Sequence, residues 1–198
     1  MSALGYQVRR WVPRRLAPRP TLDRRLYQLV NSLPHTYRGD LYIGILSDLG
    51  EGLGWWLAGA WLVLLDGSRG RRAALTAAAA SLAASRVAQD LLKPFFRRRR
   101  PWERGRSVVV GRRTFDTSFP SGHTAASFAA ATVLAGAYPK AGLPLYVTAT
   151  GVGISRIFLG HHFPTDVAAG AMLGTFIGLL GVRRGRGRGR RPRPASPR

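Results

Sequence analysis

The sequence predicts an all-α protein, a multi-pass transmembrane helix bundle with about five spanning helices and an amphipathic helix near the N-terminus. The first observation behind this is an unusual pairing: 45% of the 198 residues are hydrophobic, yet the net charge is +22. The second is where the charge lies, because an amphipathic helix of a soluble protein brings charges to its outer face regularly. Five long runs of this chain contain no Asp, Glu, Lys or Arg: 52–65, 73–85, 117–139, 141–155 and 167–182.

These runs set the expected elements. A first spanning helix covers about 45–66 and a second covers 71–92; a connector at 93–119 precedes three more helices at about 121–138, 142–160 and 164–182. A span needs ~20 mostly apolar residues, so several runs reach that length only by including an ionisable residue near one end. Such residues are costly in a membrane, and each one is therefore a candidate for function.

Three regions are expected along the chain. Residues 1–40 form a basic segment with an interfacial helix at about 21–33, residues 41–182 form the membrane-embedded domain, and residues 183–198 form a disordered tail rich in Arg, Gly and Pro. The expected location is the cell membrane, with anionic lipids bound at the basic flanks. Because basic residues flank both faces of the bundle, the charge count leaves open which face carries the site.

The composition also excludes some classes of protein. The chain has no cysteine, which removes disulfides, thiolate metal sites and a cysteine nucleophile. An Arg-rich nucleic-acid-binding protein would explain the charge, and a non-catalytic membrane scaffold would explain the helices; both remain alternatives of another class. The uncharged runs argue against the first alternative, so no nucleic-acid partner is expected.

The first chemically suggestive cluster is basic and ends the second expected helix, from Lys93 to Pro101. Lysine supplies a compact ammonium, and arginine supplies a planar fork that can hold two phosphate oxygens. The second cluster, Phe119 to His123, begins a helix rich in Ala, Ser and Thr. Ser121 suits an N-cap, and the free N–H groups of a helix start attract anions. Taken alone, the first cluster is more simply explained as a basic membrane-edge connector, and the second as a turn that caps a helix.

The third cluster runs from Ser155 to Asp166. Pro164 favours a helix start there, which places Asp166 in the first turn and His162 just before it. The Asp166 carboxylate is then expected to accept a hydrogen bond from Nδ1–H of His162, which fixes the tautomer and leaves Nε2 free as a nucleophile. A metal site using His161 as well is the weaker interpretation, because adjacent histidine side chains usually diverge; no metal is expected.

Topology brings the three clusters together. Antiparallel helices joined by connectors place the end of the second helix, the start of the third, the end of the fourth and the start of the fifth on one membrane face. An anion cradle, two histidines and an aspartate therefore converge there.

Taken in order, Lys-x6-Arg-Pro, Pro-Ser-Gly-His and Ser-Arg-x5-His-x3-Asp resemble the three signature motifs of the type 2 phosphatidic acid phosphatase family. The likeness spans about 71–182 and implies a phosphatase that uses a phosphohistidine and neither a metal nor another cofactor. By this resemblance His162 is the nucleophile, Asp166 orients it, and His123 is the general acid and then the base. The resemblance also implies a phosphate cradle made of Lys93, Arg100, Ser121, Gly122 and Arg156.

The family includes soluble haloperoxidases, but the membrane segments argue against that branch. Its membrane members commonly have six spans, and here the first is expected to be missing or degraded, because residues 1–40 offer no apolar run long enough to span. The expected substrate is a membrane-resident lipid phosphate, and the Arg-rich, Ala-rich composition suggests a GC-rich bacterium. Polyprenyl phosphates, polyprenyl diphosphates or a polyprenyl-phosphoryl sugar phosphate of the cell envelope are favoured; phosphatidic acid or phosphatidylglycerophosphate is the alternative.

Overall fold

The computed structural model describes residues 21–103, 107–113 and 116–188, and all regular structure in these ranges is helical. The residues outside these ranges include the first half of the basic N-terminal segment, 1–20, and most of the predicted tail, 189–198. The α-helices are α1 (Leu22–Asn31), α2 (Tyr37–Asp48), α3 (Gly54–Arg86), α4 (Lys93–Phe96), α5 (Gly122–Ala137), α6 (Gly142–Phe158) and α7 (Pro164–Arg188). Shorter or wider helical turns are η1 (Leu49–Leu53), η2 (Val87–Leu92), η3 (Pro101–Glu103) and η4 (Pro139–Ala141).

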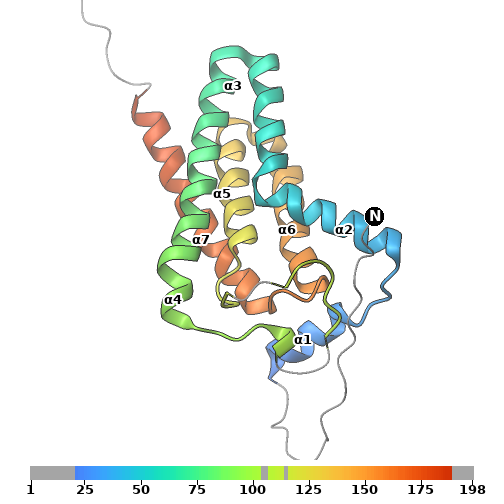
Figure 1. Ribbon diagram of the computed structural model, residues 1–198. Coiled ribbons are helices and arrows are strands. Elements are labelled where there is room, and N and C mark those ends of the chain that lie inside the picture. Colours follow the sequence, from blue (N-terminus) through green and yellow to red (C-terminus); the bar gives the residue numbers. More distant parts are fainter. Residues whose placement is uncertain (1–20, 104–106, 114–115, 189–198) are drawn as a thin grey trace, which may run out of the picture.

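Helix α3 is a hairpin whose two arms run in opposite directions along the bundle (Figure 1). The reversal occurs at Asp66 and Gly67, where Gly67 adopts φ 44° and ψ −118°, a conformation that residues with a Cβ rarely adopt. The turn is tied to the end of α5, because the Tyr138 hydroxyl donates to Asp66 Oδ2 at 2.9 Å. The predicted reversal between the first two spanning segments is therefore present.

The expectation of one continuous helix over 45–66 is wrong. The chain leaves α2 at Asp48, passes through η1, and starts α3 at Gly54, so that α2 lies obliquely beside the bundle (Figure 1). The cause is close packing at Gly50, where an added Cβ would lie 2.3 Å from Val152 Cγ2 of α6. Ser127 of α5 also donates to the Gly50 carbonyl at 2.7 Å. Glycines at the break allow η1 to approach both helices.

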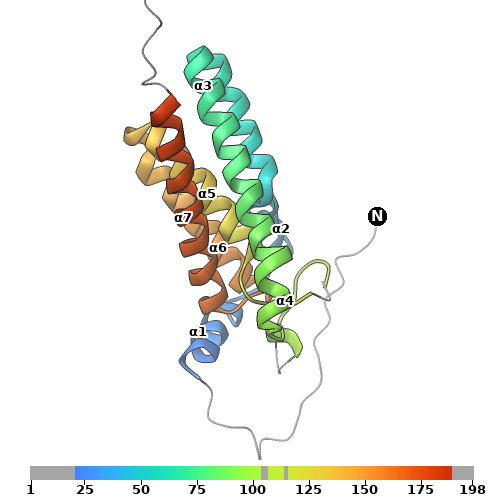
Figure 2. The same ribbon diagram turned by 90° about the vertical axis from the view of Figure 1, so that its left-hand side faces the viewer.

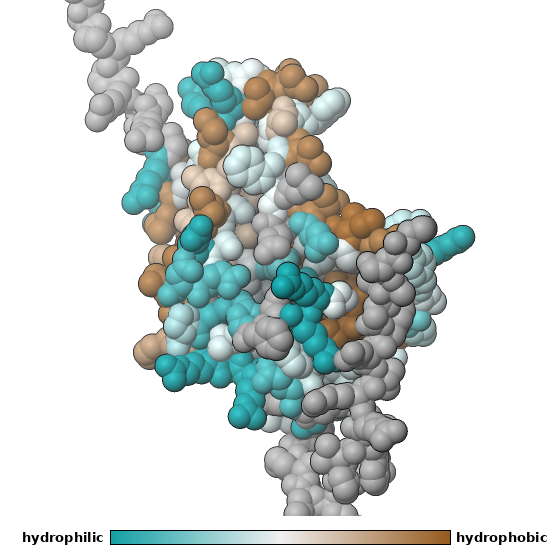
Figure 3. Space-filling model, in the orientation of Figure 1, coloured by the Kyte–Doolittle hydropathy of each residue, from teal (hydrophilic) through white to brown (hydrophobic). Residues whose placement is uncertain are grey.

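The bundle has small residues inside and large apolar residues outside. Alanines dominate the buried core between α3, α5, α6 and α7. Trp56, Trp61, Leu64 and Phe176 are each more than half exposed. Figure 3 shows apolar side chains along the bundle and hydrophilic ones gathered towards its lower end. A soluble protein of this size rarely exposes so much large apolar surface, whereas a lipid-facing surface has this character.

Helices α5 and α7 pack against each other through glycine. Gly170, Gly174 and Gly178 recur every fourth residue of α7, on one face of the helix. An added Cβ at Gly174 would lie 2.2 Å from the Ala125 carbonyl oxygen, and one at Gly170 would lie 2.5 Å from that of Ser121. This spacing is the small-residue pattern by which membrane helices approach closely. It fixes the start of α5 against the start of α7.

Within the described residues, one helical segment, Pro164–Arg184, is long and apolar enough to cross a membrane by length and composition. Helix α7 continues to Arg188, beyond the expected end at residue 182. The other boundaries in this half of the chain agree with the prediction to within two residues: α5 covers Gly122–Ala137 and α6 covers Gly142–Phe158.

The N-terminal helix α1 lies across one end of the bundle (Figures 1 and 2). On its inner face the Tyr27 ring packs edge-on against Phe163, with centroids 5.4 Å apart. The Asn31 amide donates to the carbonyls of Val108 and Phe158, both at 2.8 Å. Its outer face carries a stripe of exposed leucines at 22, 26 and 29, and Leu33, just after the helix, is exposed as well. The helix is thus amphipathic, and its position next to the loop before α7 matters for the site.

Candidate active site

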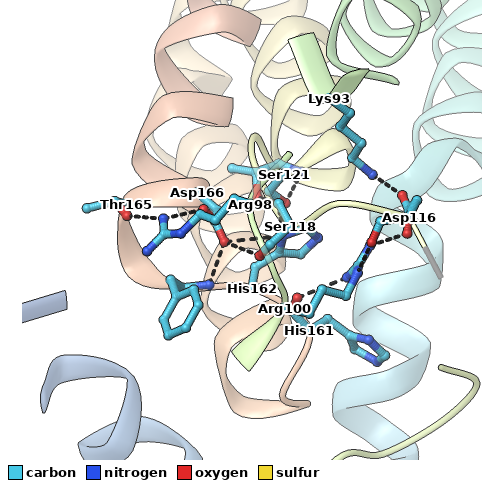
Figure 4. A network of polar contacts seen from close by, with 12 residues as sticks. Lys93, Arg98, Arg100, Asp116, Ser118, Ser121, His161, His162, Thr165 and Asp166 are labelled. Carbon is cyan, nitrogen blue, oxygen red and sulfur yellow. Dashed lines mark hydrogen bonds and ion pairs between the residues drawn. The ribbon is translucent and has the colours of Figure 1, made fainter. Parts of the chain in front are cut away.

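The signature residues converge at the end of the bundle that α1 covers. The end of η2 and α4, the start of α5, the end of α6 and the start of α7 all meet there (Figures 1 and 4). The topological argument from sequence is thus correct in its geometry: one end of the bundle carries Lys93, Arg100, Ser121, Gly122, His123, Arg156, His162 and Asp166.

Ser121 caps α5 and joins it to α7. Its fully buried hydroxyl accepts from the backbone N–H of Thr124 at 3.4 Å and from the Thr124 hydroxyl at 2.9 Å. Its own N–H donates to the carbonyl of Asp166 at 3.0 Å. Gly122 follows as the first helical residue, and an added Cβ would lie 3.3 Å from Gln89 Nε2. His123 is half-buried in this first turn.

His162 is buried, and a backbone carbonyl fixes its tautomer. Nδ1 lies 2.7 Å from the carbonyl oxygen of Ser118, so Nδ1 carries the proton and Nε2 carries the lone pair. Burial holds the pKa of His162 well below 6.5, and the charges of Arg100 and Arg156 lower it further. The imidazole is therefore neutral at physiological pH, as a nucleophile must be.

The expected hydrogen bond from His162 to Asp166 is not the one that forms. Asp166 Oδ2 lies 3.7 Å from His162 Nδ1, beyond hydrogen-bond distance. The same oxygen accepts from the Ser118 hydroxyl and, at 2.8 Å, from the N–H of Phe163. Ser118 therefore connects the two residues, because its carbonyl holds His162 while its hydroxyl holds Asp166 (Figure 4). Ser118 lies in the connector before α5, and no sequence pattern indicated that it would link His162 to Asp166.

The other oxygen of Asp166 belongs to an ion-pair network that reaches α1. Arg98 Nη1 donates to Asp166 Oδ1 and to the Thr165 hydroxyl, both at 2.6 Å. The second nitrogen of the same guanidinium pairs with Asp23 of α1. Asp23 also accepts from the N–H of Thr165 at 2.9 Å, which caps the start of α7. Arg98 lies over the Phe163 ring, 4.4 Å from its centroid.

Sequence reasoning missed these supporting residues for understandable reasons. Arg98 is one of four consecutive arginines, and nothing in the sequence distinguishes it from its neighbours. Asp23 did give a signal: it is the only acidic residue before position 40, within a strongly basic segment. In the fold, its carboxylate pairs with Arg98.

Three buried cations line the other side of the site. Arg100 donates through Nη1 to the His161 carbonyl at 2.9 Å and through Nε to the Asp116 carbonyl at 3.1 Å. Its Nη2 pairs with Asp116 Oδ1 at 2.6 Å, and the Lys93 ammonium pairs with the other oxygen of the same carboxylate. Arg156 Nη1 donates to the Ser47 hydroxyl of α2 at 2.6 Å. Buried cations require such partners, and Ser47 and Asp116 were not predicted.

His161 makes supporting contacts beside the site. Its Nε2 donates to the Val110 carbonyl at 2.9 Å, and its backbone carbonyl accepts from Arg100. Burial, followed by the charge of Arg156, lowers the pKa of His161 to about 3. Among the described residues, no group of three or more His, Asp or Glu side chains is arranged to hold a metal ion. The alternative that used His161 as a metal ligand gains no support from this geometry.

The arrangement can bind an oxyanion and attack it. A neutral imidazole with a defined free nitrogen lies among three fixed cations, and a helix N-terminus opens beside it. Preorganised donors of this kind stabilise charge that develops on phosphoryl oxygens.

Comparisons with known proteins agree with this chemistry. A model of the PAP2 superfamily matches residues 74–190. A decaprenylphosphoryl-5-phosphoribose phosphatase of Mycobacterium tuberculosis (strain CDC 1551 / Oshkosh) is 38% identical over 136 residues, which cover 68% of this chain and 74% of the relative. The crystal structure of Aquifex aeolicus LpxE is similar with a TM-score of 0.65 and 27% identity, covering 82% of this chain and 96% of that one.

A second solved structure is that of the first transmembrane PAP2 type phosphatidylglycerolphosphate phosphatase from Bacillus subtilis. It is similar with a TM-score of 0.62 and 23% identity, and the match covers 86% of this chain and 87% of that one. At this identity the likeness concerns the fold.

Proposed function

Because the chain belongs to the PAP2 superfamily, as its three motifs predicted, we propose that it is a membrane lipid phosphatase that hydrolyses a polyprenyl-linked phosphate or diphosphate. One observation carries the proposal most directly. A buried, neutral His162 lies among Lys93, Arg100 and Arg156 at one end of a bundle whose sides are apolar. That is a phosphoryl-transfer site within reach of a lipid head group.

The polyprenyl class is favoured by the sequence relatives. The Mycobacterium tuberculosis relative, whose name specifies a decaprenylphosphoryl phosphoribose, matches over most of both chains. The phosphatidylglycerolphosphate phosphatase is less similar in sequence. A polyprenyl-phosphoryl sugar phosphate is accordingly the leading substrate, and a glycerolipid phosphate is the second candidate.

The first chemical step forms a phosphohistidine. Nε2 of His162 attacks phosphorus as the bond to the leaving oxygen breaks, and Nδ1 keeps its proton in the hydrogen bond to Ser118. His123, in the first turn of α5, gives a proton to the leaving oxygen. In the second step His123 takes a proton from water, the oxygen of that water bonds to phosphorus, and the nitrogen–phosphorus bond breaks. Asp166 positions His162 through Ser118.

The cradle stabilises the charge that spreads over the equatorial oxygens. Lys93, Arg100 and Arg156 supply fixed positive charge, while Ser121 and the N–H of Gly122 lie at the positive end of α5. Once a phosphate is bound, these donors need little further reorganisation during the reaction.

We further propose five membrane spans: the two arms of α3, the second continued by η2, and α5, α6 and α7. The leucine stripe of α1 then lies in the interface, and the exposed arginines at 97 and 99 contact anionic lipids. In this proposal the protein resides in the cell membrane, and the lipid substrate enters the site from the bilayer.

Phosphate release from a panel of lipid phosphates in detergent tests this function. The panel contains polyprenyl phosphate, polyprenyl diphosphate, a polyprenyl-phosphoryl sugar phosphate, phosphatidic acid and phosphatidylglycerophosphate, each with EDTA present. Native protein is compared with His162→Ala and with the larger His162→Gln, after both variants are shown to be monodisperse with native-like unfolding temperatures.

The expected result is activity that survives EDTA, is highest on a polyprenyl substrate, and is lost in both variants. Activity removed by EDTA would indicate a metal-dependent reaction. No release from any lipid by folded native protein would leave a binding or scaffolding role.

A further inference from the structure

Asp116 occupies the space between two residues of the proposed phosphate cradle. One carboxylate oxygen pairs with the Lys93 ammonium, and the other lies 2.6 Å from Arg100 Nη2 (Figure 4). We propose that Asp116 is a competing carboxylate, which holds the two cations in the free enzyme and must give them up when a phosphate binds. This inference rests on the proposed phosphatase function and deepens it by naming what limits phosphate affinity.

The exposed fractions of the three side chains show which of them lies nearest to solvent. Only 6% of the Lys93 side chain and 3% of the Arg100 side chain are exposed, against 40% for Asp116. The carboxylate therefore lies on the accessible side of the two cations. A phosphate that approaches them meets Asp116 first.

In the free enzyme, the Asp116 carboxylate neutralises the two cations as a bound phosphate would. Lys93 and Arg100 are buried, and two buried cations without a counter-charge would repel each other and destabilise the fold. A carboxylate presents two oxygens, as one edge of a phosphate does, and satisfies the same donors. When phosphate replaces Asp116, Lys93 and Arg100 lose one anionic partner as they gain another, so the net gain in binding free energy is small. The consequence is weaker retention of phosphate, which favours release of the inorganic product.

The surrounding contacts allow the charge of Asp116 to be tested without dismantling the cradle. Arg100 keeps its bonds to the backbone carbonyls of His161 and Asp116 when the Asp116 side chain changes. The following residues are anchored separately, because the Thr117 hydroxyl donates to the Lys93 carbonyl at 3.0 Å and the Ser118 N–H donates to the Arg98 carbonyl at 2.7 Å. Asp116→Asn therefore removes the charge and leaves the backbone in place.

The test is binding of inorganic phosphate and of orthovanadate to purified full-length protein in detergent, measured from the rise in unfolding temperature with ligand concentration. Asp116→Asn is compared with native protein and with Glu103→Gln as the matched control. Glu103 is a carboxylate of the same connector, but its partner within the described residues is the backbone N–H of Arg100, at 3.2 Å.

We expect Asp116→Asn to bind both anions about tenfold more tightly, with Glu103→Gln unchanged. The sign of the effect is decisive, since a carboxylate that merely positions the cations would weaken anion binding when removed. Unchanged or weaker binding by Asp116→Asn, in a protein whose native form hydrolyses lipid phosphates, overturns the role of Asp116 alone. If neither protein binds either anion and no lipid phosphate is hydrolysed, the cradle itself is wrong and this inference fails with it.

Discussion

His162 and Asp166 are coupled through a third residue: Asp166 Oδ2 stays 3.7 Å from His162 Nδ1, and Ser118 contacts both side chains. The backbone carbonyl of Ser118 sets the tautomer of His162, and its hydroxyl fixes the carboxylate of Asp166. The orientation of His162 therefore depends on the position of the 116–118 segment, which is bonded to the first residue of α4 and to Arg98 in the connector after it.

This bridge predicts unequal effects for two substitutions. Ser118→Ala removes the hydroxyl and keeps the carbonyl, so kcat should fall about tenfold, the equivalent of one ordinary hydrogen bond. Asp166→Asn should lower kcat about a hundredfold or more, because three donors converge on this carboxylate. Steady-state kinetics on the preferred lipid phosphate show which of the two substitutions lowers kcat more. A larger loss for Ser118→Ala than for Asp166→Asn would contradict the bridge.

The contacts of α1 with Arg98 and with the start of α7 predict a role for this N-terminal helix in turnover. Arg98→Ala and Asp23→Asn should each lower kcat about tenfold, because Arg98 orients Asp166 and Asp23 orients Arg98. Orthovanadate inhibition should change little, since neither residue contacts the cradle cations. Arg99→Ala, an exposed neighbour, is the matched control and should leave kcat unchanged. A parallel loss of vanadate affinity would indicate general damage to the site.

The buried histidine His161 predicts a loss of stability in acid. Its pKa is about 3 when folded and about 6.5 when unfolded, so between these values only the unfolded chain takes up the proton. The free energy of unfolding should therefore decrease as the pH falls below about 6.5, by about 1.4 kcal/mol per pH unit for a single such group. Unfolding temperatures of native protein and His161→Gln between pH 7 and pH 4.5 measure this. Equal slopes for the two proteins would show that His161 does not contribute.

Glycine packing between α5 and α7 predicts a position-specific stability effect. Gly174→Ala places a methyl group 2.2 Å from the Ala125 carbonyl oxygen, so it should destabilise the bundle by about 1–3 kcal/mol. Gly44→Ala is the control, because nothing lies within 4 Å of its added Cβ in helix α2. That change should be neutral or slightly stabilising, as alanine is the better helix former. Similar unfolding temperatures for the two variants would contradict the close approach of the helices.

The success of prediction from sequence differed between parts of the molecule. The boundaries of α5 and α6 were predicted from the uncharged runs at 117–139 and 141–155 and from Ser121 as an N-cap, because composition and capping act locally. The break at η1 did not follow, since it depends on how Gly50 packs against Val152 of a helix about a hundred residues later. Placement of the motif residues at one end followed from antiparallel topology alone.

The supporting residues were harder to predict than the motif residues. Asp116 and Ser118 act through loop geometry that no periodic pattern encodes, and Ser47 reaches Arg156 from a different helix. Arg98 differs from Arg97 and Arg99 only by the carboxylates that the fold brings to it. Long-range placement, rather than residue type, decides which arginine of the run belongs to the site.

The central claim is that His162 becomes covalently phosphorylated, and trapping that intermediate tests it most directly. A nitrophenyl phosphate has a leaving group that needs no proton, so His123→Ala should still transfer phosphoryl to His162 but should fail to activate water. Rapid mixing should then release about one equivalent of nitrophenol per protein, with an acid-labile phosphate on the peptide that contains His162. Steady release of nitrophenol with no phosphate bound to His162, or the same burst from the double variant His123→Ala with His162→Ala, would contradict the account.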